Sequence, residues 1–164
     1  MAKKEKGTGK TNAVRLLEKA GVAFETKEYP VDEEHLDARH VAESVGEDIS
    51  LVFKTLVLRG ERTGLFVCVI PGAEEVDLKK AARAAGDKKA EMLPMKELLP
   101  NTGYIRGGCS PVGMKKPLPT FFHSSALDHP KIYVSAGQRG TQLIIAPQEL
   151  IKFVGGTVSD LIKY

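Results

Sequence analysis

Apolar residues recur at helical spacing in several stretches of the chain. Between Thr11, a typical N-cap residue, and Gly21, a typical helix end, they recur every three or four positions, which predicts a helix. Similar patterns between capping, proline and glycine residues predict helices over 37–45, 77–85, 95–99 and 148–154, and a further turn over 159–162.

Short apolar runs bounded by turn residues predict the strands. They span residues 22–29, 51–58, 65–70, 103–106, 120–123, 132–135 and 142–146. The polar stretch 59–64 joins the second and third of them as a hairpin. Strands and helices mix without the strict alternation of a parallel doubly wound sheet. The expected fold class is therefore α+β, a single compact domain with a mixed, mostly antiparallel sheet.

Length and composition narrow the class of protein. With 164 residues, of which 42% are hydrophobic and 27% charged, the chain can bury a core as one globular domain, which excludes disorder and fibrous repeats. The longest apolar run, 65–70, is too short for a membrane span, and no secretory signal follows the basic N-terminus. Two cysteines without CxxC spacing fit a reducing compartment. We therefore expect a cytoplasmic protein with no membrane partner.

Charge is distributed unevenly along the chain. Residues 1–10 hold four Lys and one Glu, and we expect them to form a basic flexible tail ahead of a domain over 11–164. Residues 11–101 carry 13 basic and 17 acidic side chains, whereas residues 102–164 carry 7 and 3. The basic C-terminal part could meet an anionic partner such as a phosphate or nucleic-acid backbone, or it could be an ordinary solvated surface.

Lys54 lies in the middle of the apolar strand LVFKTLVL. Strand geometry places its side chain on the face of Leu56 and Leu58, while Phe53 and Thr55 take the other face. On a buried face the ammonium group must lie in a cleft or meet an anion, because an unpaired buried charge is strongly disfavoured. On an edge strand it could instead reach water or discourage aggregation, and the pattern leaves both interpretations open.

Two glycine-rich stretches, GGCSPVGMKKPLP at 107–119 and YVSAGQRGT at 133–141, form a second candidate site. Paired glycines allow backbone N–H groups to converge on an anion or a developing oxyanion. The alternative is two tight structural turns with solvated lysines. Neither stretch matches a P-loop or GxGxxG, and the four histidines lack zinc-site spacing, so we expect no metal and no cofactor.

Four motifs together resemble the YbaK/EbsC family, the free-standing relatives of the editing insertion domain of prolyl-tRNA synthetase. They are FKTLVL at 53–58, DLKKAARAAG at 77–86, TGYIRGGCSPVGMKKPLPTF at 102–121 and IYVSAGQRG at 132–140. The resemblance covers nearly the whole chain from Thr11 and implies a twisted mixed sheet flanked by helices. It also implies a trans-editing deacylase that removes cysteine from Cys-tRNA(Pro), and possibly from Cys-tRNA(Cys). A deacylase for another aminoacyl group such as alanine, acting through water, and a non-catalytic tRNA-binding or synthetase-binding module remain alternatives.

The resemblance also implies roles for individual residues. Lys54 would lie near the 3′-terminal adenosine and its phosphates, and the backbone amides of Gly107 and Gly108 would form an oxyanion hole, so these three are the expected catalytic residues. The expected substrate contacts are Tyr29, Leu36, Ser110, Pro111, Gly113, Ser135, Gly137, Arg139 and Gln142. Two of them depart from the family pattern, because Gln142 stands where a carboxylate is usual and Leu36 is the nearest apolar residue to a pocket phenylalanine.

In this branch of the family the thiol of the substrate is thought to attack its own ester, so no catalytic triad is expected. Cysteine and proline are similar in size, and a synthetase pocket separates such substrates only about 10–200-fold, which creates the need for a second enzyme. The expected partners are the 3′ end of aminoacyl-tRNA and prolyl-tRNA synthetase, not DNA. The synthetase would supply tRNA identity because the near-neutral domain lacks a broad basic face.

Overall fold

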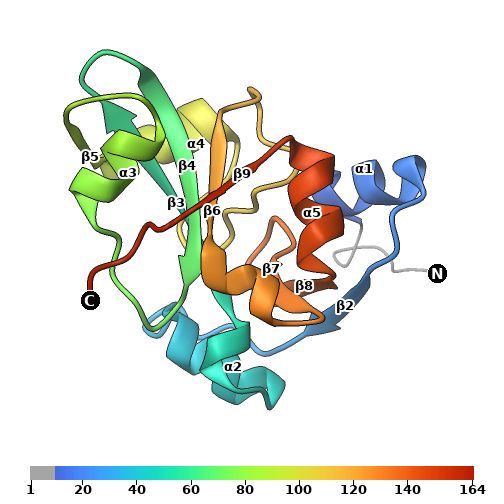
Figure 1. The fold of residues 1–164 in the computed structure, drawn as a ribbon. Coiled ribbons are helices and arrows are strands. Elements are labelled where there is room, and N and C mark those ends of the chain that lie inside the picture. The colour runs from blue at the N-terminus through green and yellow to red at the C-terminus, as the bar shows by residue number, and fades with distance from the viewer. Residues whose placement is uncertain (1–9) are drawn as a thin grey trace.

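Two β-sheets form the framework of the structure, a computed structural model that describes residues 10–164 (Figure 1). The strands are β2 (Glu25–Glu28), β3 (Phe53–Gly60), β4 (Gly64–Pro71), β5 (Ala90–Met92), β6 (Thr120–His123), β7 (Ile132–Ser135), β8 (Thr141–Ile145) and β9 (Thr157–Ser159). The helices are α1 (Asn12–Ala20), α2 (Ala38–Val45), α3 (Leu78–Ala84), α4 (Leu98–Thr102) and α5 (Pro147–Val154), with 3-10 turns η1 (Ile49–Leu51), η2 (Met95–Glu97) and η3 (Ser124–Asp128).

The larger sheet has the strand order β5-β3-β4-β6-β9 and is mixed. Its strands β5, β3 and β4 run antiparallel, whereas β4, β6 and β9 run parallel. The smaller sheet, β2-β8-β7, is wholly antiparallel. The α+β class is therefore confirmed, with the strands divided between two sheets where we expected one.

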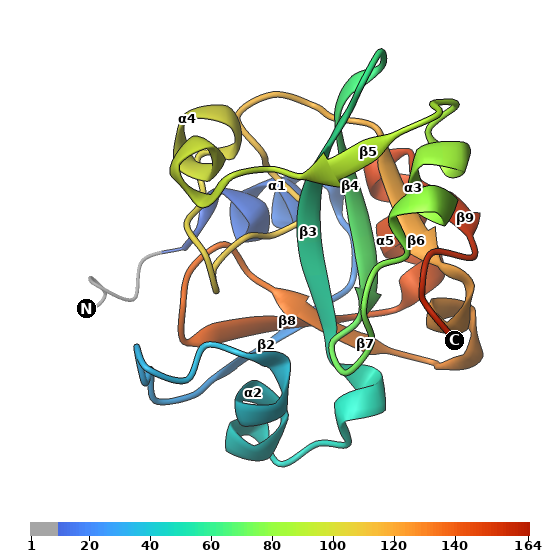
Figure 2. The same cartoon turned by 90° about the vertical axis from the view of Figure 1, so that its left-hand side faces the viewer.

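The main core lies between the two sheets. Apolar side chains of β3 and β4 meet those of β7 and β8 there, and α1 and α5 contribute to the same cluster. A second cluster joins the other face of β3 and β4 to α3, and a third joins α2 to Val52 and Tyr133. Both views show α2 at the bottom of the molecule, beneath the small sheet (Figures 1 and 2). Each sheet therefore has apolar neighbours on both faces.

Local chemistry explains where helices and turns begin and end. Thr11 caps α1, because its Oγ1 accepts a hydrogen bond from the Val14 amide at 3.2 Å, and its hydroxyl donates to the Ala136 carbonyl at 2.6 Å. Gly21 ends α1 with φ +73°, as predicted. The Asp87 carboxylate accepts from the amides of Arg62 and Thr63 and so fixes the β3–β4 turn. Among residues 10–164, none of the helices has the length and apolar character that crossing a bilayer requires.

Three predicted elements differ from the structure. Residues 103–106 are not a strand, because α4 runs to Thr102 and Gly103, with φ +82°, turns the chain into a loop. Residues 159–162 are not a helical turn: β9 ends at Ser159 and Ile162 bridges to Val76. The strand predicted over 22–29 shortens to β2, and β5 was not predicted, because its three residues have no alternating pattern.

The buried side chain of His123 makes folding stability dependent on pH. Its Nδ1 accepts a hydrogen bond from the Leu161 amide at 3.1 Å, and burial lowers its pKa below the usual value near 6.5, although Asp160 opposes this shift. The unfolded chain therefore takes up a proton at this site before the folded chain does. Stability should fall as the pH drops below about 6.5, by at most about 1.4 kcal/mol per pH unit from this group.

Thermal unfolding between pH 7.5 and 5 tests this prediction, with His123→Asn as the control because its amide oxygen can still accept the Leu161 hydrogen bond. The variant should show a flatter pH dependence over that range. Equal slopes for the two proteins would contradict the assignment.

Candidate functional site

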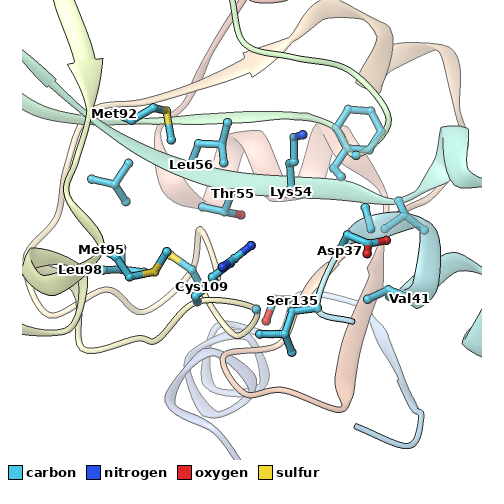
Figure 3. A pocket seen from close by; sticks show the side chains of 18 of the residues that line it. Asp37, Val41, Lys54, Thr55, Leu56, Met92, Met95, Leu98, Cys109 and Ser135 are labelled. Carbon is cyan, nitrogen blue, oxygen red and sulfur yellow. The ribbon is translucent and has the colours of Figure 1, made fainter. Parts of the chain in front are cut away.

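A cavity of about 490 Å³ lies where β3 leaves its neighbour β5 (Figure 3). β5 pairs with β3 only through Leu58, Arg59 and Gly60. Beyond them the Val57 carbonyl accepts from the Leu93 amide, and β7 meets β3 only at the bridge between Tyr133 and Val52. Within residues 10–164, no strand pairs with this edge of β3 from Lys54 to Leu56, and the cavity opens along it. α2 and the segment before it form one end of the cavity, and β5, η2 and α4 form the other.

The two faces of β3 both contribute to the cavity. Figure 3 shows Lys54 and Thr55 pointing to opposite sides of the strand, as the alternation of a strand requires. Leu56 and Leu58 pack with the α3 cluster and Phe53 and Val57 with the main core, which confirms the predicted sharing of faces. Lys54 therefore lines the cavity from the face of β3 that also carries Leu56 and Leu58, the face turned away from the main core.

Lys54 is half-buried and has no ion-pair partner among the described residues. Burial lowers the pKa of its amine, and the carboxylates of Glu75 and Glu74 oppose this shift from a distance. Together with Arg106 it gives the cavity two basic side chains against one acidic one, Asp37. Such a site favours a ligand with negative charge near the Lys54 side.

The glycine loop forms the wall opposite β3. Gly107 lines the cavity with φ +83°, a conformation that favours glycine. The Gly108 amide, in contrast, donates to the Ile105 carbonyl at 2.9 Å, and a Cβ at Gly108 would lie only 3.0 Å from the Arg139 backbone nitrogen. Gly107 therefore has the geometry of a pocket residue, whereas Gly108 is a close-packing residue, a correction to its expected role as a second amide donor.

The third wall comes from β7 and β8. Ser135 and Gln142 are paired across these strands and both line the cavity. The Ser135 hydroxyl accepts a hydrogen bond from the Gly137 amide at 3.2 Å. Gln142 is only 4% exposed, and its Oε1 has no hydrogen-bond partner in the part of the chain that the structure describes. With Leu36, these residues are the predicted substrate contacts that the structure brings to the cavity.

The other predicted contacts lie outside the cavity lining. Ser110, Pro111 and Gly113 are internal to the loop that packs on α1, where Ser110 Oγ accepts from Val112 N and Gly113 O accepts from Asn12. The sequence predicts them as substrate contacts because they directly follow the glycine pair. In the structure their hydrogen bonds hold the loop together and attach it to α1.

Three more predicted contacts also lie outside the lining. Arg139 donates to the Arg106 carbonyl at 2.8 Å and so holds the glycine loop. Gly137 packs against the ring of Tyr104, where a Cβ would lie only 3.0 Å from a ring carbon. Tyr29 packs against the cluster under α2. We assign Arg139 and Gly137 a positioning role in place of direct contact.

Several lining residues were not predicted. The apolar wall at the β5 end consists of Met92, Leu93, Met95 and Leu98, and no sequence signal marks it. Arg106 stands directly before the glycine pair, and Thr55 follows Lys54. Asp37 was expected only to cap α2, which it does by accepting from the His40 amide at 2.9 Å. Position next to a predicted site residue was the only available signal for Arg106 and Thr55.

The cavity is lined by the hydroxyls of Thr55 and Ser135, but among residues 10–164 by no histidine that could activate them. Cys109 lines it, but burial raises the pKa of its thiol to about 12, so the thiol is protonated at neutral pH. Residues 10–164 contain no group of three His, Cys, Asp or Glu side chains placed to hold a metal ion. What the cavity offers is positive charge, the backbone of the glycine turn at Gly107, and neutral polar groups.

The model of the aminoacyl-tRNA editing domain matches residues 32–153, which include every residue that lines the cavity. The chain belongs to the aminoacyl-tRNA editing domain family. Editing removes a wrongly attached amino acid from tRNA, so the chain is by family an aminoacyl-tRNA deacylase. The resemblance seen in the sequence is thereby confirmed.

Individual members of the family agree with this assignment. EbsC of Enterococcus faecalis, named as a proposed Cys-tRNA(Pro)/Cys-tRNA(Cys) deacylase, is 48% identical over 98% of both chains. YwhH of Bacillus subtilis, an uncharacterized protein, is 29% identical over 79% of this chain and 78% of its own.

Solved structures share the fold. A protein described as a proposed trans-editing enzyme for prolyl-tRNA synthetase is 28% identical, with a TM-score of 0.82 over 96% of this chain and all of that one. A hypothetical protein with 22% identity has a TM-score of 0.85 over 93% of this chain and all of that one. This second likeness supports the fold alone.

Burial of both thiols predicts that native protein reacts slowly with Ellman's reagent. Burial raises the pKa of Cys68, like that of Cys109, to about 12, so thiolate is scarce at pH 8. Absorbance at 412 nm should show a small initial signal and two equivalents after unfolding in guanidinium chloride. Rapid reaction of one equivalent in the native state, absent from a Cys109→Ser variant, would contradict the inert character of Cys109.

Proposed function

We propose that this protein removes cysteine from mischarged Cys-tRNA(Pro), and also from Cys-tRNA(Cys), by letting the substrate thiol attack its own ester. The name of EbsC supports the substrate, because that relative matches the chain from end to end. The composition of the cavity supports the mechanism. It places a lysine and a glycine turn around an open space. The Cys109 thiol there is buried and protonated, and no histidine among the described lining residues could activate the hydroxyls of Thr55 and Ser135.

In the proposed reaction a sulfur–carbon bond forms and the ester carbon–oxygen bond breaks. The thiol proton leaves with or before the attack, and one proton ends on the departing 3′-terminal oxygen of the tRNA. The products are uncharged tRNA and a cyclic thioester of cysteine, which water then opens. The protein contributes position and electrostatic stabilisation, and well-oriented intramolecular reactions gain greatly from position alone.

Gly107 is the proposed oxyanion donor. Its amide has no hydrogen-bond partner among the described residues, unlike that of Gly108. One such donor typically contributes about 10²–10³-fold in rate. Lys54 would hold the 3′-terminal nucleotide through its phosphates, which accounts for a basic side chain without an ion-pair partner on the far side of β3.

Single-turnover deacylation of labelled Cys-tRNA(Pro), Ala-tRNA(Pro) and Ser-tRNA tests the proposal. Cysteine should be released well above the spontaneous rate, and alanine and serine should not, because they lack a thiol. Lys54→Ala should lower the rate by about 10²-fold through lost positioning. Lys89→Ala, outside this cavity, is the matched control and should behave like wild type.

Release of alanine would favour attack by water in place of the thiol. No release of any amino acid, with unaltered binding of tRNA, would leave the chain a binding module and overturn the proposal. A Lys54→Ala rate equal to wild type would remove Lys54 from the mechanism.

The same proposal makes prolyl-tRNA synthetase the source of tRNA identity. Basic and acidic side chains are balanced at 20 each over residues 11–164, so the domain has little net attraction for an acceptor stem. The isolated protein should therefore deacylate Cys-tRNA(Pro) and Cys-tRNA(Cys) at rates within a fewfold of each other. Addition of the synthetase should favour Cys-tRNA(Pro), and strong discrimination by the isolated protein would contradict this view.

A further inference from the structure

Two buried polar atoms on the cavity wall have no hydrogen-bond partner within residues 10–164. They are Thr55 Oγ1 and Gln142 Oε1, and both residues line the cavity described above. A third such atom, in Ser125, lies elsewhere. Native structures rarely leave buried polar atoms unpaired, because each loses its hydrogen bonds to water without replacement. Two of them on one cavity indicate that a ligand completes the site.

The backbone of Thr55 adds a further acceptor at the same place. The Val57 carbonyl accepts a hydrogen bond from the Leu93 amide across the edge that faces β5. Backbone groups two residues apart in a strand point the same way, so the Thr55 carbonyl also faces this edge, where no strand among residues 10–164 covers it. The Thr55 side chain points toward the wall that carries Ser135 (Figure 3).

We propose that Thr55 and Gln142 together hold the α-ammonium group of the aminoacyl ester. The ligand follows from the function proposed above, and the new element is the group that these residues bind. An ammonium group brings three N–H donors and no acceptor, and this end of the cavity presents carbonyl, amide and hydroxyl oxygens that can accept. Asp37 is the one carboxylate among the described lining residues; it lies at the end of the cavity that α2 forms (Figure 3), and one of its oxygens accepts from α2.

This arrangement explains how a family position that usually holds a carboxylate can hold Gln142. The amide oxygen accepts a hydrogen bond from the ammonium group without charge, and Thr55 supplies a second acceptor. This ammonium site, formed by Thr55 and Gln142, would also fix the rotation of the aminoacyl group about its α-carbon. That rotation decides whether the thiol can reach the ester carbon. Thr55 is therefore a positioning residue for the substrate.

The affinities of non-cleavable analogues test the ammonium site independently of catalysis. We would compare 3′-amino-3′-deoxyadenosine linked through an amide to cysteine with the same nucleoside linked to 3-mercaptopropionic acid, which lacks only the amino group. Calorimetry at pH 6.5, where the amine is protonated, should show at least about tenfold tighter binding of the cysteinyl analogue to wild type.

Thr55→Val should reduce this preference to about twofold or less, with unchanged affinity for the mercaptopropionyl analogue, and Gln142→Leu should reduce it likewise. Thr55→Ser keeps the hydroxyl and should keep the preference. Asp37→Asn retains the helix cap and should retain most of the preference. Thr55→Val should also raise the melting temperature by about 2–4 °C, because it removes an unpaired buried hydroxyl.

The proposal is overturned if wild type does not distinguish the two analogues, or if Thr55→Val weakens both equally. It is also overturned if Asp37→Asn abolishes the preference and Thr55→Val does not. If no amino acid is released in the deacylation assay but the preference for the cysteinyl analogue persists and depends on Thr55, the proposed function is rejected and the ammonium site is retained.

Discussion

The incomplete pairing between β3 and β5 is the constraint on which the site depends. β5 covers only the last three residues of β3, and the chain then turns away into η2 and α4. An uncovered strand edge presents backbone donors and acceptors that must find water, another strand or a ligand. In this protein that edge lines a cavity, opposite the glycine loop. The early end of the β3–β5 pairing therefore creates the cavity.

The edge also explains how one strand can contribute to two sides of a ligand. Lys54 leaves β3 toward the outer side and Thr55 toward the inner side, so a molecule that lies across the edge meets a cation on one side and neutral acceptors on the other. An aminoacylated nucleotide has this distribution of groups, with phosphate at one end and an amine at the other. The glycine loop, held by the bond from Arg139 to the Arg106 carbonyl, faces the region between them.

The sequence was informative about Lys54 and Gly107 because each violates a local rule. A lysine in an apolar strand and a paired glycine in a loop are costly unless they are used, and both line the cavity. Adjacency in sequence does not predict contact with the cavity in the loop that follows the glycine pair. Ser110 accepts a hydrogen bond from Val112 within the loop, and Gly113 accepts one from Asn12 of α1. The Gly108 amide donates to the Ile105 carbonyl. These contacts depend on how the loop folds back on itself.

Long-range placement set the limit of prediction. Met92 and Met95 reach the cavity only because β5 stops early, and Thr55 is distinguished from any strand threonine only by its missing hydrogen-bond partner. The division of the strands into two sheets likewise depends on pairings such as β2 with β8, which join residues far apart in sequence. No local pattern contains that information.

The proposed mechanism requires that the substrate, and no group of the protein, provides the nucleophile. The most direct measurement is single-turnover deacylation of S-methylcysteinyl-tRNA(Pro) beside Cys-tRNA(Pro), since the methyl group blocks the thiol and leaves the ester and the amine unchanged. If the substrate thiol attacks, cysteine is released and S-methylcysteine leaves the tRNA only at the rate of spontaneous hydrolysis. Enzyme-dependent release of S-methylcysteine at a rate near that of cysteine would contradict it and assign the attack to water or to the protein.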